Sequence, residues 1–175
     1  RSTKMRELLL CKAVPPQWGT AYAALLAESG LRDEGHTDIT ALLTEDDTLL
    51  GCGSLGGKVF RQVAVSPAAE GQDICARIVS ALVQESVKRG VPYPFLFTKP
   101  RNTRLFRSLG FYPVAETTDM AMLCRQRDAL RRFLEPLPRW QEGVTGCVVC
   151  HANPFTRGHL HLITTAAEQC GHVLV

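Results

Sequence analysis

Hydrophobic positions along the first two thirds of the chain alternate between helical and extended spacing. One apolar helical face lies in residues 18–28, and a longer one begins at Ile74 and ends at Arg89-Gly90. Between them, residues 38–44, 48–54 and 59–65 have the pattern of strands, the first two joined by an acidic turn. A short strand at 93–98, a short helix at 102–109 and two strands within 111–125 follow. This order predicts an α/β fold.

The pattern changes after residue 125. Residues 126–143 combine arginines, leucines and prolines, which predicts a linker with one short amphipathic helix. Its arginines are interpreted as a solvated helix face, with a docking patch as the alternative. A second α/β unit then begins, with strands at 144–150 and 172–175 on either side of a helix at 157–170. We therefore expect a first domain over 1–125, a linker over 126–143 and a second domain from 144 to 175.

Composition limits the classes of partner. The 175 residues are 45% hydrophobic and 21% charged, as in globular proteins, and the net charge of +3 is too small to indicate nucleic acid as the main partner. The apolar runs are too short to cross a bilayer, and Lys12 interrupts the first of them too early for a secretory signal. Seven cysteines, an odd and scattered set, favour a reducing compartment. The sequence predicts a cytoplasmic protein without a membrane partner.

The segment Gln62-Val63-Ala64-Val65-Ser66-Pro67, followed by a loop, a long helix and then Leu109-Gly110-Phe111, resembles the Gcn5-related N-acetyltransferase fold. The resemblance covers residues 3–124 and implies a mixed sheet with flanking helices. It also implies a groove at Val63, Val65 and Gly71 in which a pantetheine arm pairs with the exposed strand backbone, while the loop and the helix start hold a pyrophosphate.

Four residues depart from that family. Glu70, Asp73 and Cys75 stand where its phosphate loop has Gln or Arg, then Gly, then Gly or Ala, and Phe106 stands where many members have a proton-donating Tyr. Losing the glycine hinders close backbone approach, two carboxylates repel a pyrophosphate, and a phenyl ring donates no proton. We therefore expect weak binding of acetyl-CoA in the usual manner, and a domain retained for binding or packing.

The segment Asn153-Pro154-Phe155-Thr156-Arg157-Gly158-His159 lies between a predicted strand and a predicted helix, where α/β sheets place phosphate sites. Thr156 can cap the helix and offer its hydroxyl, Gly158 leaves room for a nucleotide, and His159 can donate an N–H to a phosphoryl oxygen. The cluster indicates phosphate recognition. The alternative is a simple helix start, with an N-cap, a glycine and a partly buried histidine; His161 is expected on another, solvated face.

Thr156-Arg157-Gly158-His159 resembles the Thr/His-x-Gly-His motif of the nucleotidyltransferase superfamily. The longer string, which adds Gly146 to Val149, Ala152 to Phe155, Ala166-Ala167 and Gln169-Cys170 beside an acetyltransferase-like unit, resembles the citrate lyase ligase family. That resemblance implies an ATP-binding ligase: acetate and ATP form acetyl-adenylate and pyrophosphate, and the thiol of a dephospho-CoA-type arm on the acyl carrier subunit of citrate lyase takes the acetyl group, releasing AMP. His159 and Thr156 are then catalytic, Asn153, Phe155 and Gly158 bind ATP, and Mg²⁺ screens the phosphates.

Residues 144–175 are interpreted as the N-terminal fragment of a Rossmann-like nucleotidyltransferase domain, so we expect the 175-residue chain to be inactive alone. Two functions stay open. In the first, the chain is part of this ligase, and its first domain recognises the CoA-like arm. The second is an acetyltransferase-like binding or scaffold module without catalysis, and acetyl-CoA-dependent N-acetyl transfer is a weaker third.

A metal or haem site is not expected. Cys147, Cys150 and His151 match the short haem-attachment pattern. Cysteines three apart on a predicted strand face opposite sides, however, which disfavours both haem and zinc. No protein ligand for a metal is therefore predicted.

Overall fold

The computed structural model describes residues 5–139 and 142–175 of the chain. The chain divides into two compact units, Arg1–Leu130 and Arg131–Val175, which are described separately. The division falls inside the linker expected at 126–143. Among the described residues, no helix combines the length and the apolar character that a membrane crossing needs.

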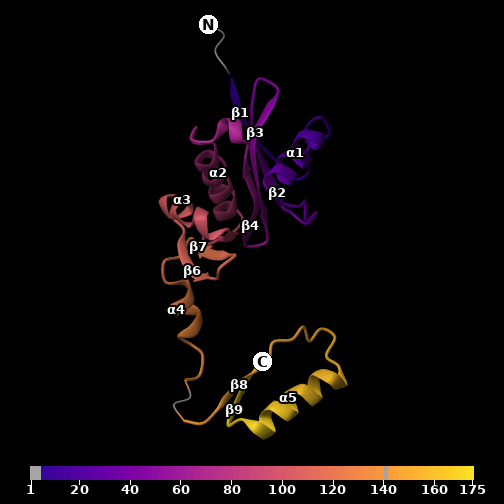
Figure 1. Cartoon of the computed structure of the whole chain (residues 1–175), viewed down its shortest axis with the longest axis vertical. Helices are drawn as coiled ribbons and strands as arrows, with labels where there is room; N and C mark the ends of the chain where they lie inside the picture. The colour runs from indigo at the N-terminus through magenta and orange to yellow at the C-terminus, as the bar shows by residue number, and fades with distance from the viewer. Residues whose placement is uncertain (1–4, 140–141) are drawn as a thin grey trace. The chain divides into compact units, whose positions relative to one another are not determined.

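A seven-stranded mixed sheet forms the first unit (Figure 1), in the order β1-β2-β3-β4-β5-β7-β6. Its strands are β1 (Arg6–Cys11), β2 (Ile39–Glu45), β3 (Thr48–Gly56), β4 (Val59–Val65), β5 (Phe95–Thr98), β6 (Tyr112–Glu116) and β7 (Ala121–Cys124). Strands β4 and β5 pair in parallel, and the other neighbours pair antiparallel. The helix between β4 and β5 makes this parallel pairing possible.

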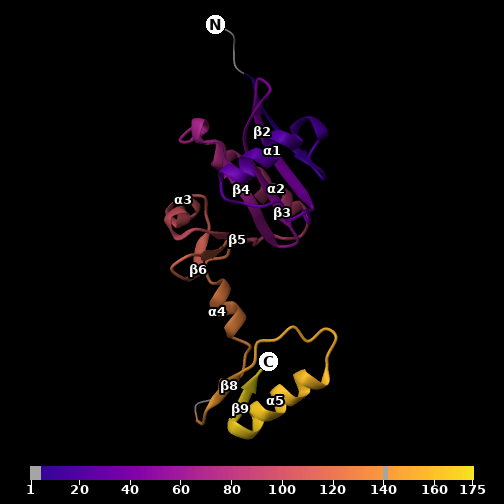
Figure 2. The ribbon, with the colours of Figure 1, turned by 45° about the vertical axis from the view of Figure 1, so that its right-hand side comes forward.

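The helices of this unit are α1 (Pro16–Glu28), α2 (Ile74–Lys88) and α3 (Thr103–Ser108), with 3₁₀ turns at Pro67–Ala69 and Pro100–Asn102. Helices α1 and α2 lie on opposite sides of the sheet (Figures 1 and 2). Each covers its own core: the α2 side buries residues of β2 to β5, β7 and α3, and the α1 side buries a smaller set from β2 to β4. The α/β fold predicted from the pattern is therefore confirmed, with two cores sharing one sheet.

Glycines in β3 let α2 lie close to the sheet. A Cβ at Gly51 would come within 2.8 Å of both Ile74 and Ile78, and one at Gly53 within 2.9 Å of Ile78. Both distances are shorter than side chains tolerate without movement. The two glycines thus fix where α2 rests, and with it the start of the helix beside β4.

The first strand was missed by the sequence analysis, which considered that segment only as a failed secretory signal. All six residues of β1 pair with β2, from Arg6 opposite Glu45 to Cys11 opposite Thr40. Three consecutive leucines, Leu8 to Leu10, hide the alternation of an edge strand, although only Leu8 of the three packs against the core.

The second unit contains β8 (Thr145–Cys147), α5 (Arg157–Gln169) and β9 (His172–Leu174); the short helix expected before it is α4 (Ala129–Leu134). Strands β8 and β9 pair in parallel, and α5 runs beside them (Figure 2). The first strand is shorter than the predicted 144–150, because its pairing with β9 ends at Cys147 opposite Leu174, followed by a hydrogen bond from the Val148 N–H to the Leu174 carbonyl (2.8 Å).

Candidate functional site

A cleft opens in the first unit where β4 and β5 diverge. The two strands pair only at Val59 opposite Phe95 and Phe60 opposite Leu96. Beyond those pairs the space between them becomes a cleft of about 810 Å³. Val63, Val65 and Gly71, the three residues assigned from the sequence to an arm groove, all line it. The cleft is also lined by the start of α2, the end of α1 and the segment from β5 to α3.

A β-bulge at Gln62 shapes the cleft side of β4. Gln62 has a positive φ of 54°, and the register with β3 slips there, from Ser54 opposite Arg61 to Cys52 opposite Ala64. An extra residue in one strand reverses the faces of the residues beyond it. Phe60 accordingly packs in the α2 core, whereas Ala64 packs in the α1 core.

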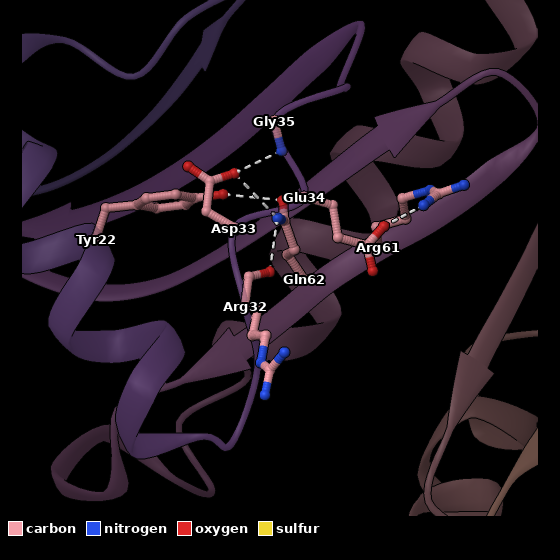
Figure 3. A network of polar contacts seen from close by, with 7 residues as sticks. All are labelled: Tyr22, Arg32, Asp33, Glu34, Gly35, Arg61 and Gln62. Carbon is pink, nitrogen blue, oxygen red and sulfur yellow. Dashed lines mark hydrogen bonds and ion pairs between the residues drawn. The ribbon is translucent and has the colours of Figure 1, made fainter.

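The Gln62 side chain ties the loop after α1 to this bulge (Figure 3). The Tyr22 hydroxyl donates to Gln62 Oε1 at 3.0 Å, and Gln62 Nε2 donates to the Arg32 carbonyl at 3.0 Å and to Asp33 Oδ1 at 3.3 Å. The Gly35 N–H also donates to Asp33 Oδ1, at 3.0 Å. Burial raises the pKa of Tyr22 to about 12, so its hydroxyl stays protonated and donates.

An ion pair fastens the same loop at a second point. Arg61, next to the bulge, pairs with Glu34 (Figure 3). The chain just before this pair, at residues 28–31, lines the cleft. The bulge therefore sets both the direction of β4 and the position of the loop that bounds one side of the cleft.

The loop before α2 has two residues in the left-handed conformation and two exposed carboxylates. Asp73, at the start of α2, has φ 60° and ψ 14°, the left-handed conformation that glycine adopts most readily, and its side chain caps nothing. Gly71 has φ 76°. The exposed carboxylates of Glu70 and Asp73 both belong to the cleft lining. Asp73 thus combines a backbone conformation that glycine adopts readily with a negative charge at the cleft.

Phe106 lines the cleft and also belongs to the hydrophobic core. Its ring is 5% exposed and stands edge-on to Phe111, with ring centres 6.4 Å apart at 82°. Burial raises the pKa of Cys75, another cleft residue, to about 11, so this thiol is protonated at neutral pH. No Tyr or His is among the described residues that line the cleft. Among the described lining residues, the role that many family members give to a tyrosine is therefore left without a tyrosine or a histidine.

In the second unit, the residues predicted to bind phosphate gather at the start of α5. Thr156 is the N-cap, and the His159 N–H donates to its Oγ1 at 3.4 Å. In return the Thr156 N–H donates to His159 Nδ1 at 3.0 Å, and Thr156 Oγ1 lies 2.9 Å from the same nitrogen. This is a capping box in which histidine replaces the usual Glu or Gln.

The cap defines the tautomer of the His159 ring. Because Nδ1 accepts the Thr156 backbone N–H, that nitrogen carries no proton, and in the neutral ring the proton sits on Nε2. The ring therefore presents an N–H donor on the side away from the cap. The Phe155 ring lies beside it, with ring centres 5.7 Å apart.

The remaining predicted residues share this loop and first helical turn. Asn153, Phe155 and Gly158 are exposed, and a Cβ at Gly158 would meet no atom nearer than Thr156 Oγ1 at 3.6 Å. His161 is also exposed. The start of α5 therefore has open space, backbone N–H groups and an imidazole donor together, which suits an anionic ligand.

The cysteines form no ligand cluster. Cys147 is exposed, and Cys150 lies beyond the end of β8, so the argument that both share a strand was wrong. Across residues 5–139 and 142–175, no group of three His, Cys, Asp or Glu side chains is arranged to hold a metal ion.

Solved structures with a similar fold to the first unit are acyltransferases. N-acetylglutamate synthase from Neisseria gonorrhoeae, complexed with coenzyme A and N-acetyl-glutamate, matches 68% of this chain and 35% of its own, with a TM-score of 0.58 and 19% identity. An acyl-CoA N-acyltransferase from Pseudomonas aeruginosa matches 70% of this chain and 100% of its own, with a TM-score of 0.59 and 16% identity. These similarities show the Gcn5-related N-acetyltransferase fold.

Sequence relatives point to one family. Residues 145–175 match the family model of the citrate lyase ligase C-terminal domain. Citrate (pro-3S)-lyase ligase of Klebsiella pneumoniae is 32% identical over 153 residues, covering 86% of this chain and 45% of its own length, and that of Escherichia coli is 30% identical over 151 residues, covering 85% and 43%. The chain spans less than half the length of these relatives. With an acetyltransferase-like domain followed by residues of that C-terminal domain, the chain belongs to the citrate lyase ligase family.

Proposed function

We propose that this chain supplies two binding sites of an ATP-dependent acetate:thiol ligase that acetylates the arm of the citrate lyase acyl carrier subunit. The observation that carries the proposal is the Thr156–His159 capping box, which presents an imidazole N–H at the start of α5 within the segment matched to the ligase domain. The three cytosolic substrates are acetate, ATP and the carrier thiol. Seven free cysteines fit a reducing cytoplasm.

The first step forms acetyl-adenylate. An acetate oxygen attacks the α-phosphorus of ATP and pyrophosphate leaves, so negative charge builds on the phosphoryl oxygens. His159 Nε2–H donates to one of these oxygens, the backbone N–H groups at the start of α5 add their dipoles, and Thr156 holds the ring in its donor tautomer. Asn153, Phe155 and Gly158 form the wall against which the nucleotide rests. Mg²⁺ held by the phosphates would supply further charge neutralisation.

The second step transfers the acetyl group to the carrier thiol, with release of AMP. In this proposal the cleft of the first unit holds the pantetheine portion of the arm, because the β4 backbone around Val63 and Val65 has no strand partner on the β5 side beyond Phe60. The acidic loop, with Glu70 and Asp73, disfavours a free pyrophosphate close to α2.

The same acidic loop favours a second candidate, a scaffold that binds no pantetheine at all. Calorimetric titration of the chain with dephospho-CoA and with CoA separates the two functions. Arm recognition predicts saturable binding of dephospho-CoA that is lost when Val63→Asp places a charge in the cleft. If the wild-type chain binds neither dephospho-CoA nor CoA, the arm-recognition function is contradicted and the scaffold function is supported.

Nucleotide recognition is tested by titrating the ¹⁵N-labelled chain with Mg·ATP and following amide shifts by NMR. The proposal predicts shifts at residues 153–159 and at least fivefold weaker binding of ATP by His159→Ala, which removes the ring donor. The matched variant His161→Ala, in the same helix and equally polar, should bind as the wild type does. Shifts absent from 153–159, or equal losses in both variants, would contradict the assignment.

A further inference from the structure

Four cationic side chains follow one another along the side of the cleft formed by the end of β5 and by α3. They are Lys99, Arg101, Arg104 and Arg107, and all four are exposed. No Asp or Glu occurs in residues 99–107. In the part of the chain that the structure describes, none of the four is ion-paired. Their charges are therefore available to a partner.

The helix that carries two of these arginines turns them outward. Phe106 is the buried residue of α3 and holds the helix against the core. At about 100° per residue, Arg104 and Arg107 point roughly 160° and 100° away from Phe106. Glu116, an acid in contact with α3, accepts a hydrogen bond from the Thr103 hydroxyl at 3.4 Å.

The four cations together extend beyond the space that a ligand in the cleft would occupy. Lys99 and Arg101 line the cleft, whereas Arg104 and Arg107 lie outside the lining. A small anion in the cleft would engage the first pair only. A strip that starts at the cleft and continues along the outside of α3 matches the larger footprint of a protein.

Apolar side chains accompany the charges. Leu105 and Phe97 are 46% and 49% exposed, and both line the cleft beside the cations. Protein interfaces combine arginine with such apolar anchors. A long phosphate chain fits less well, because the cleft lining also carries the carboxylates of Glu70 and Asp73.

We propose that Lys99, Arg101, Arg104, Arg107 and Leu105 form a docking strip for an acidic face of the carrier protein whose arm enters the cleft. The inference rests on the proposed function, since it assumes that the arm arrives attached to a protein. Steering by the strip would bring the base of the arm to the cleft opening, and complementary charge mainly accelerates such encounters.

Binding of the citrate lyase acyl carrier subunit tests the strip. Holo-carrier, apo-carrier and free dephospho-CoA are each titrated into the wild-type chain, the Arg104→Glu/Arg107→Glu double variant and the single variant Lys58→Glu. Lys58 is an exposed cation in the turn between β3 and β4, outside the cleft lining. We expect the double variant to bind both carrier forms at least tenfold more weakly, with unchanged affinity for dephospho-CoA, and Lys58→Glu to change carrier binding less than twofold. Circular dichroism checks that the variants fold.

The outcomes separate this inference from the proposed function. Unchanged carrier binding in the double variant, or an equal loss in Lys58→Glu, overturns the docking strip and leaves arm recognition intact. An equal loss of dephospho-CoA binding in the double variant also overturns it, because the cations would then serve the phosphates of the arm. If the wild-type chain binds apo-carrier in a salt-dependent manner but binds no dephospho-CoA, the strip stands and arm recognition fails.

Discussion

Replacing Gln62 tests whether the bulge and its hydrogen bonds determine the shape of the cleft side of β4. In Gln62→Ala the Tyr22 hydroxyl, on a residue only 5% exposed, loses its acceptor, which costs about 1–3 kcal/mol. The bonds to Arg32 and Asp33 contribute less, because those residues are exposed and water can replace the amide. We expect a total loss of about 2 kcal/mol in the free energy of unfolding.

Comparison with Gln62→Gly isolates the backbone. In a regular strand, Gly is less stable than Ala by about 0.5–1 kcal/mol. At φ 54° the order reverses, since Ala is strained there and Gly is not. Gln62→Gly should therefore be more stable than Gln62→Ala by roughly 0.5–1 kcal/mol, after the larger unfolded-state entropy of Gly is subtracted.

Urea unfolding followed by circular dichroism measures both differences, provided that the m-value is unchanged. Adding Tyr22→Phe to Gln62→Ala should cost less than the sum of the single losses, because the hydroxyl left unpaired by one change is removed by the other. A glycine variant less stable than the alanine variant would refute the positive-φ bulge, and strictly additive losses would refute the buried hydrogen bond.

Three further predictions concern the first unit. Burial raises the pKa of Cys52 to about 12 and that of Cys75 to about 11, from 9.0, so the folded state holds protons that the unfolded state releases, and stability should fall as pH rises above about 9, by up to about 1.4 kcal/mol per pH unit for each thiol; urea curves at pH 8, 9 and 10, with a smaller slope in Cys75→Ala, check this. Gly53→Ala should destabilise by about 1–3 kcal/mol through the clash with α2, whereas Gly19→Ala, in an open helical position, should stabilise by up to about 1 kcal/mol; thermal melts that rank them otherwise would contradict the packing. Asp73→Gly and Asp73→Asn should both tighten dephospho-CoA binding about fivefold, since each removes roughly 1 kcal/mol of like-charge repulsion; calorimetry showing no gain in either would refute the electrostatic account.

Hydrophobic periodicity was enough to predict most of the elements. The stripe of Ile74, Ile78 and Leu82 specified α2, and those three residues are now fully buried against β3. A run of three leucines concealed β1, because an edge strand exposes residues on both faces. Strand β1 forms because it pairs with β2, which is a long-range contact that a local sequence pattern does not reveal.

The bulge left a trace in the sequence that strand alternation alone passes over. Phe60 and Val63 pack on the same core although they stand three residues apart, a spacing that a regular strand forbids. Phe60, Val63 and Val65 together therefore imply one extra residue between the first two. Two polar residues, Arg61 and Gln62, lie between them, and the sequence does not say which one is the extra residue, because the three partners of the Gln62 side chain come from distant segments.

The residues around α5 were placed correctly in a loop and first helical turn, because Thr156 and Gly158 are local signals of a helix start. The histidine in the capping box was not foreseen, since the usual third residue is Glu or Gln. Nor did the sequence show that Arg104 and Arg107 of α3 point away from the core. Only the burial of Phe106 determines which way α3 turns.

The bulge in β4 also determines which core each of the following residues faces. Before Gln62 an even-numbered residue, Phe60, faces the α2 core. After Gln62 the odd-numbered Val63 and Val65 face that core, and the even-numbered Ala64 faces the α1 core. A regular strand that kept Gln62 would send Val63 and Val65 to the α1 core, where Ala64 packs, whereas deleting Gln62 would restore regular pairing and leave Val63 and Val65 on the α2 side. By absorbing one residue, the bulge keeps the cleft wall at Val63 and Val65 on the side of the sheet that α2 covers.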